Sequence, residues 1–98
     1  MPVLLDLNVP EFQKRWFSLG KEERVAVLNT LVKLSALEWD SVYRDSGLHW
    51  ELIKKRLAPD GSRLYSIRVS HKFRAAVWRR GQYMTFLTLH PDHDSAYQ

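Results

Sequence analysis

Several groups that can move protons stand together after the last apolar run of the chain. The run Phe86–Leu89 stops at His90, and the sequence HPDHDSAY occupies positions 90–97. An unperturbed histidine titrates near pH ~6.5, so His90 and His93 can each serve as a general acid or base at neutral pH. Tyr97 can donate a hydrogen bond or stack on a nucleobase. We therefore expect His90, His93 and Tyr97 to be catalytic residues.

Positive charge is concentrated in one part of the chain. The protein carries a formal net charge of +4, and residues 54–80 contain nine Lys or Arg but only one acidic residue. A basic block of this kind indicates a polyanionic partner such as nucleic acid. Arg68 and Arg74 offer permanently charged, bidentate donors for a phosphate. Further contacts to RNA phosphates, which add affinity without sequence readout, are expected from Lys54, Lys55, Arg56, His71, Lys72 and Arg79.

Arginine, histidine and tyrosine together suit metal-free cleavage of RNA. In that reaction a base takes the proton of a ribose 2′-OH, whose oxygen attacks the adjacent phosphate, and an acid protonates the leaving 5′-oxygen. Cations stabilise the doubly charged phosphorane between these steps. The segment HPDHD also contains metal-ligating residue types, but no further histidine cluster supports it and the chain has no cysteine. We expect neither a metal nor a cofactor.

Length and composition are those of one globular domain, residues 1–98. Apolar residues make up 45% of the chain, and no apolar run approaches the roughly 18–20 residues that span a bilayer. The start, MPVLLDLNVPEF, lacks the basic segment of a signal peptide and contains Asp6. The sequence therefore predicts a soluble, cytoplasmic protein with no membrane partner.

Periodicity predicts a strand and two helices in the first half of the chain. Residues 3–5 are apolar and read as a short strand. A helix follows, with Asn8 as the expected cap, Pro10 in its first turn and Gly20 at its end. In the segment 21–37, apolar residues recur at 3–4 spacing on a broad face, so we expect this second helix to pack against a large surface. The two helices form a hairpin.

The second half predicts a sheet. The segment 38–61 gives a weak pattern, and its part HWELIKKRL allows either a short strand or a helical turn. Three consecutive antiparallel strands follow, over 63–70, 74–80 and 83–89. The predicted fold is α+β: an N-terminal strand, a helical hairpin and a three-strand meander, with the helices on one face. The other face is expected to be open.

Alternation in the first strand of the meander predicts which residues occupy each face. Tyr65, Ile67 and Val69 share one side and should face the helices, whereas Ser66 and Arg68 point to the open side. Arg74, on the next strand, is expected on that open side as well. The open face would therefore present arginines to an RNA.

This order of elements, with three short motifs, resembles the RelE/ParE toxin superfamily of type II toxin–antitoxin systems. Members show a Y-x-I/L-R/K strand, a Y/F-R pair opening the next strand, and a polar run with a tyrosine after the last strand. Here these read Tyr65-Ser66-Ile67-Arg68, Phe73-Arg74, and His90 to Tyr97. The resemblance covers almost the whole chain. The first basic position of the family's strand falls on Ser66 here, so one cation is missing.

The resemblance implies a RelE-like mRNA interferase, an endoribonuclease that enters the ribosomal A site and inhibits translation by cutting messenger RNA. It implies that Arg74 contacts the scissile phosphate and that Tyr97 stacks on or orients the substrate base. Arg68 matches the second basic position of the family's strand. His93 lies at a position where different branches of the superfamily have a basic residue or a histidine. The implied partners are a cognate antitoxin, mRNA and ribosomal RNA.

Two other functions remain open at this point. A ParE-like inhibitor of DNA gyrase shares the fold, but such members generally lack the acid and base groups found between His90 and Tyr97. A non-catalytic module that binds only an antitoxin or RNA is the other alternative, and the serine at position 66 leaves room for it.

Overall fold

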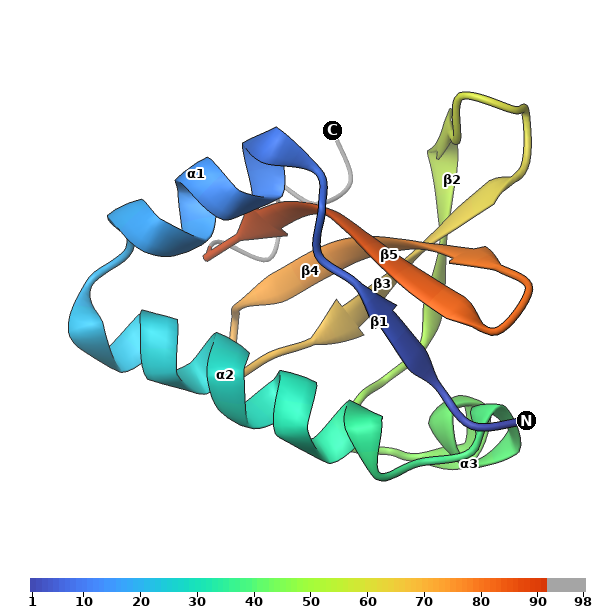
Figure 1. Ribbon diagram of the computed structural model, residues 1–98, viewed down its shortest axis with the longest axis horizontal. Coiled ribbons are helices and arrows are strands. Elements are labelled where there is room, and N and C mark those ends of the chain that lie inside the picture. Colours follow the sequence, from blue (N-terminus) through green and yellow to red (C-terminus); the bar gives the residue numbers. More distant parts are fainter. Residues whose placement is uncertain (92–98) are drawn as a thin grey trace.

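The protein is an α+β domain with one mixed sheet and three helices in the computed structural model, which describes residues 1–91 (Figure 1). The elements follow the chain as β1 (Leu4–Asp6), α1 (Pro10–Ser18), α2 (Lys21–Ser35), α3 (Trp39–Arg44), β2 (Glu51–Leu57), β3 (Arg63–Arg68), β4 (Arg74–Arg80) and β5 (Tyr83–His90). The strand order in the sheet is β1-β5-β4-β3-β2. The predicted α+β class is confirmed.

The meander has four strands, where the sequence predicted three. The ambiguous segment HWELIKKRL forms β2, which pairs antiparallel with β3 and places Glu51 opposite Ser66. The strands β3, β4 and β5 follow in antiparallel register, and β1 closes the other edge by pairing parallel to β5. A third helix, α3, was also missed because six residues are too few to show helical periodicity.

The helices cover one face of the sheet, as predicted. The apolar side chains that they bury join a single core with strand residues, and this core includes Phe12, Val27, Leu31, Leu34, Trp39, Val42, Ile67, Ala75, Val77, Met84, Phe86 and Leu89. The rings of Phe12 and Phe86 lie 5.3 Å apart, which fixes α1 on β5. Tyr65 and Val69 pack against the same core, so the predicted helix-facing side of β3 is confirmed.

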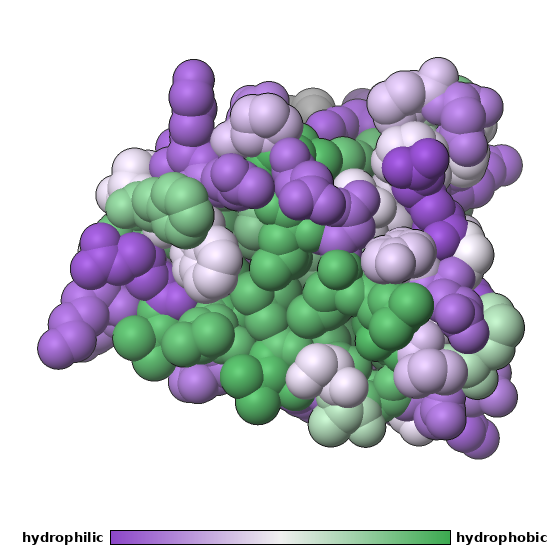
Figure 2. All heavy atoms as spheres, in the orientation of Figure 1, coloured by the Kyte–Doolittle hydropathy of each residue, from purple (hydrophilic) through white to green (hydrophobic). Residues whose placement is uncertain are grey.

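Two details of the helices differ from the predictions. Asn8 does not cap α1: Val9 precedes the helix, and the Asn8 side chain instead donates to the Asp6 carboxylate. Only part of the apolar face of α2 packs against the core. One stripe is buried, whereas the other is exposed: Val25 by 44%, Leu28 by 48% and Val32 by 60%. This stripe belongs to the continuous apolar area that Figure 2 shows over α2.

The prediction that the helix-free face of the sheet is open is wrong. The centre of this face is filled by a smaller buried cluster of Ile53, Ala58, Leu64, Ala76 and Trp78. The direction of β2 crosses that of the other strands (Figure 1), and its register shifts after Ile53. This irregularity allows Ala58, beyond the end of the strand, to join the cluster. Ser66 is likewise fully buried.

Candidate functional site

The register of the sheet brings three of the predicted residues into one row. Arg68 lies opposite Arg74, and Arg74 lies opposite His90. Neighbouring strands are about 4.8 Å apart, so these three positions span roughly 10 Å across the sheet. The row is on the helix-free face, because the intervening residues on each strand belong to the helix-side core. His93 and Tyr97, the other predicted catalytic residues, lie outside the described residues.

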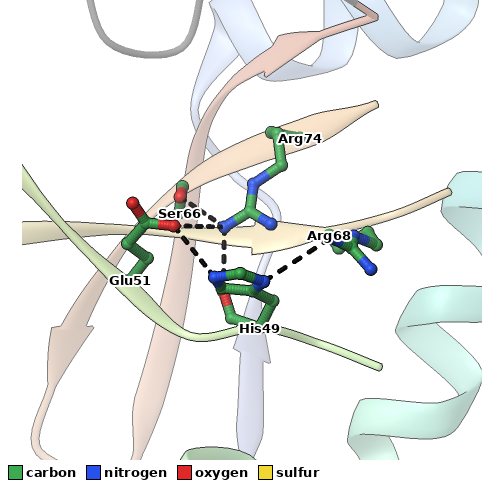
Figure 3. Close-up of polar contacts among 5 residues, drawn as sticks. All are labelled: His49, Glu51, Ser66, Arg68 and Arg74. Carbon is green, nitrogen blue, oxygen red and sulfur yellow. Dashed lines mark hydrogen bonds and ion pairs between the residues drawn. The ribbon is translucent and has the colours of Figure 1, made fainter. Parts of the chain in front are cut away.

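Arg74, in the middle of this row, is buried and makes several polar contacts (Figure 3). Only 1% of it is exposed, so the prediction that it faces solvent is wrong. Its Nη2 donates to the Ser66 hydroxyl oxygen at 2.6 Å and to the His49 carbonyl oxygen at 2.8 Å. The Glu51 carboxylate lies 3.9 Å from the same nitrogen. Ser66, where the resemblance to the RelE/ParE pattern predicted a cation, thus accepts a hydrogen bond that orients Arg74.

His49 and Glu51, which sequence reasoning missed, complete the cluster in Figure 3. The His49 Nε2 lies 3.1 Å from a Glu51 carboxylate oxygen, and its Nδ1 lies 3.5 Å from Nη2 of Arg68. The backbone of His49 has a φ of 49°, which is unusual for a residue other than glycine. Strained conformations of this kind concentrate at functional sites. We call His49, Glu51, Arg68 and Arg74 the cationic cluster.

The contacts of His49 assign its tautomer. Arginine can only donate hydrogen bonds, so the nitrogen facing Arg68, Nδ1, acts as the acceptor. The proton of a neutral ring then sits on Nε2, where it is donated to Glu51. A carboxylate that holds one imidazole nitrogen leaves the other oriented as a base, which is the arrangement of hydrolytic triads. The lone pair of this base points toward a guanidinium.

The segment before β2 is fixed to the rest of the domain. Asp45 accepts hydrogen bonds from Lys33 on α2 and from the backbone N–H of Leu48. The Lys33 bond and then the Leu48 bond lower the pKa of Asp45. Leu48 is buried in the core, and its carbonyl accepts from the backbone N–H of Arg68 at 2.6 Å. These contacts hold His49 on its N-terminal side, and the pairing of Glu51 with Ser66 holds it on the other.

His90 occupies the far end of the row, in basic surroundings. Burial is the main cause that lowers its pKa, and the positive charges of Arg56 and Arg15 lower it further. Its Nε2 is 2.7 Å from the Thr88 hydroxyl oxygen. A pocket of about 420 Å³ lies beside it, between α1 and the end of β5, lined by Glu11, Lys14, Arg15, Ser18, Thr88, Leu89 and His90.

The remaining basic candidates divide between two regions. His71 and Lys72 are exposed in the turn that joins Arg68 to Arg74, so they border the row directly. Lys54 and Lys55 are exposed on the edge strand β2, and Arg56 follows them. Arg79 is not part of this group. It lies on the helix-covered face, where its guanidinium carbon is 4.1 Å from the centre of the Trp39 ring.

Two further observations concern the described part of the chain. Residues 1–91 contain no group of three or more His, Asp or Glu side chains that could hold a metal ion together. None of the helices found in that range has the length and apolarity needed to cross a membrane.

Comparisons of the chain with protein-family models, curated proteins and solved structures found no match. The resemblance to the RelE/ParE superfamily therefore stays a prediction from the residue pattern.

Proposed function

We propose that this protein is the toxin of a type II toxin–antitoxin system, and that it cleaves messenger RNA on the ribosome without a metal ion. The observation that supports this most strongly is the cationic cluster. An imidazole oriented by a carboxylate stands next to two arginines, one of them exposed, within a strongly basic region of the chain. These are the groups that 2′-OH attack on a neighbouring phosphate requires.

His49 is the proposed general base. Its Nδ1 takes the proton of the ribose 2′-OH while the oxygen of that hydroxyl attacks the adjacent phosphorus. Glu51 accepts the hydrogen bond from Nε2–H, which stabilises the positive charge that forms on the ring. The same carboxylate lies 3.9 Å from Nη2 of Arg74, so Glu51 stands between the imidazole and the buried guanidinium.

Arg68 is the proposed phosphate ligand. Its guanidinium is solvent-exposed and adjacent to Nδ1 of His49, so a phosphate bound there would bring its ribose to the base. Charge-assisted bonds from arginine strengthen as the phosphorane gains its second negative charge. Arg74, which is buried, acts as a positioning residue: its bond to the carbonyl oxygen of His49 keeps the imidazole at the correct place.

The proton for the leaving 5′-oxygen is proposed to come from the segment that ends the last strand. His90 occupies the same row as the two arginines, and His93 follows three residues later. A lowered pKa makes the protonated form of His90 a stronger acid, although less of it is present at neutral pH. Substitution of each histidine separately decides which one donates the proton.

Exposed basic residues near the cluster are proposed to hold ribosomal RNA. His71 and Lys72 extend from the turn next to the row, and Lys54 and Lys55 extend from the edge strand β2. Contacts of this kind to phosphates add affinity that decreases steeply with salt concentration, and they read no sequence.

The exposed apolar stripe of α2 is the proposed docking surface for the antitoxin. Val25, Leu28 and Val32 are all exposed on α2, and Figure 2 shows a continuous apolar area over this helix. Areas of this kind mark interaction surfaces. We propose that a helix or an extended segment of the antitoxin covers it, with acidic residues that complement the net charge of +4.

The proposal is tested by expressing the chain and following growth and messenger RNA. We expect growth arrest, with transcripts cut in codon register in a reconstituted translation reaction. His49→Gln and Arg68→Ala should abolish cleavage while the far-ultraviolet circular dichroism spectrum is unchanged. Arg44→Ala, which removes an exposed arginine on α3, is the matched control and should cleave normally.

Two results would contradict the proposal. Full cleavage by both cluster variants would remove His49 and Arg68 from the mechanism. Growth arrest accompanied by a DNA-damage response, with intact messenger RNA, would instead select the gyrase-inhibitor alternative.

A further inference from the structure

A second pocket with a distinct composition lies on the helix-covered face of the sheet. Its volume is about 340 Å³, and its lining comes from α3, from the residues just before β2 and β3, and from β3 and β4: Tyr43, Trp50, Ser62, Arg63, Tyr65 and Arg79. We call it the aromatic pocket. Three of these six side chains are aromatic, two are arginines, and none is acidic. The cationic cluster lies on the other face of the sheet, so this pocket is not used by the proposed cleavage chemistry.

The aromatic rings form a connected set that is open to solvent. The rings of Trp50 and Tyr65 stack with their centres 4.5 Å apart and their planes 21° from parallel. The ring of Tyr43 meets that of Trp50 edge to face at 5.3 Å. Tyr43 is 45% exposed, whereas Trp39 behind it is 2% exposed and belongs to the core. The set is thus anchored on one side and accessible on the other.

The two arginines at this pocket differ in how firmly they are held. Arg79 is fixed: it packs over the Trp39 ring, and its guanidinium donates to the carbonyl oxygen of Gly81 and to the hydroxyl of Tyr43. Arg63 is exposed at the start of β3, where it borders the opening. A flat, apolar surface flanked by an accessible cation matches a nucleobase with its phosphate.

We propose that the aromatic pocket binds a base of single-stranded RNA, stacked on the exposed ring of Tyr43 with Trp50 beside it, while Arg63 contacts a flanking phosphate. Single-stranded RNA is the fitting ligand because its unpaired bases are free to stack on aromatic side chains. The lining contains two arginines and no carboxylate, so its positive charge favours an anionic ligand such as RNA.

The inference rests on the proposed function, since it gives the same RNA a second contact. The segment His49-Trp50-Glu51 runs along the edge of the sheet and connects the two sites. His49 and Glu51 turn toward Arg68 and Arg74, whereas the ring of Trp50 lies on Tyr65. Successive side chains on a strand point to opposite faces, so the two sites lie on opposite sides of the same edge strand. A nucleotide close to the cleaved bond can therefore reach the pocket around the edge strand.

The test measures binding without cleavage. A 2′-O-methyl RNA of about ten nucleotides spans a typical single-strand site and cannot undergo 2′-OH attack. Its affinity is measured by fluorescence anisotropy for the wild-type chain, Tyr43→Ala and Arg63→Ala. Tyr83→Ala is the matched control, because Tyr83 is 50% exposed but lies on β5, outside the pocket. We expect each pocket variant to bind roughly tenfold more weakly and the control to bind like the wild type.

Nuclear magnetic resonance identifies the site independently. On titration with the same oligonucleotide, the indole N–H signal of Trp50 should shift strongly. The signal of Trp16 should not move, because its indole N–H donates to the Arg24 carbonyl oxygen elsewhere on the helices.

Equal affinity of the wild type, Tyr43→Ala and Arg63→Ala, or an unmoved Trp50 signal at saturation, would overturn the inference. Arg63 is an exposed residue, so its variant remains informative if Tyr43→Ala does not fold. A failure of the proposed function looks different: natural RNA stays intact in the presence of ribosomes, whereas the uncleavable oligonucleotide still binds in the pocket.

Discussion

Replacing His49 by glycine separates catalysis from stability. A φ of 49° costs a residue with a Cβ about 1–2 kcal/mol, and glycine removes that cost. Glycine in turn loses about 0.5–1 kcal/mol more backbone entropy on folding. The hydrogen bond to Glu51 is also lost, but the two side chains are 50% and 44% exposed, so solvent screening limits it to about 0.5 kcal/mol. The free energy of unfolding of His49→Gly should therefore stay within about 1 kcal/mol of the wild type.

Cleavage should respond very differently. General base catalysis by a positioned side chain contributes about 10²–10⁴-fold to a rate, and glycine offers no group that accepts the 2′-OH proton. We expect the single-turnover rate of messenger RNA cleavage in a reconstituted translation reaction to fall by at least about 100-fold. His49→Asn, which tolerates a positive φ but lacks the imidazole, should show the same loss.

Urea unfolding followed by circular dichroism gives the stability, and Ser46→Gly is the matched control because it adds a glycine to the same exposed segment. The control should keep full activity. If His49→Gly lost more than about 2 kcal/mol of stability while still cutting RNA, the His49 side chain would serve folding and not catalysis, and the role assigned to it would be refuted.

Three other predictions test separate parts of the structure. Arg74→Lys should lower the free energy of unfolding by about 1.5–3 kcal/mol in urea titrations, because the shorter amine cannot keep both bonds to Ser66 and His49; unchanged stability would contradict the positioning role. Leu28→Lys should leave stability within about 0.5 kcal/mol, since this residue is 48% exposed, but should weaken antitoxin binding at least tenfold by calorimetry; equal affinity would move the docking surface elsewhere. The pKa of His90 is lowered from 6.5 in the folded protein, so the unfolded chain binds the proton first as the pH falls. The free energy of unfolding should therefore decline below about pH 6.5, and a His90→Gln variant with the same decline would show that another group is responsible.

The row of basic residues could be predicted from the sequence because its determinants are local. Alternation along Tyr65, Ser66 and Ile67 fixes which side of β3 faces the core. A short turn then brings Arg74 opposite Arg68. Neither step depends on distant parts of the chain. The predicted face of β3 is confirmed, and the structure adds the register between Arg68 and Arg74.

The cluster around His49 could not be predicted, because it depends on a pairing between strands. The register of Glu51 with Ser66 is set by β2, whose sequence is equally compatible with a strand or a helical turn. A positive φ at His49 also has no local signature, since Gly47 is the nearby residue that would suggest one, and its φ is not positive. Burial of Arg74 was unforeseen because an arginine is rarely buried without partners, which here come from other segments.

The exposed stripe of α2 illustrates another limit. Val25, Leu28 and Val32 have the same helical spacing as Val27, Leu31 and Leu34, so periodicity cannot tell which stripe meets the sheet. Only the packing of α2 on the strands decides that, and it leaves the first stripe on the surface.

The parallel pair β1–β5 has a consequence for synthesis. A hydrogen bond joins Asp6 to Thr85 across 79 positions of the chain. The strand β1 therefore cannot pair in the sheet until β5 has been synthesised. Until β5 leaves the exit tunnel, Phe12 lacks the ring that it packs on, and the position opposite Arg74 is empty. We expect a nascent chain of this protein to be inert, so the proposed cleavage of messenger RNA would begin only after β5 has joined the sheet.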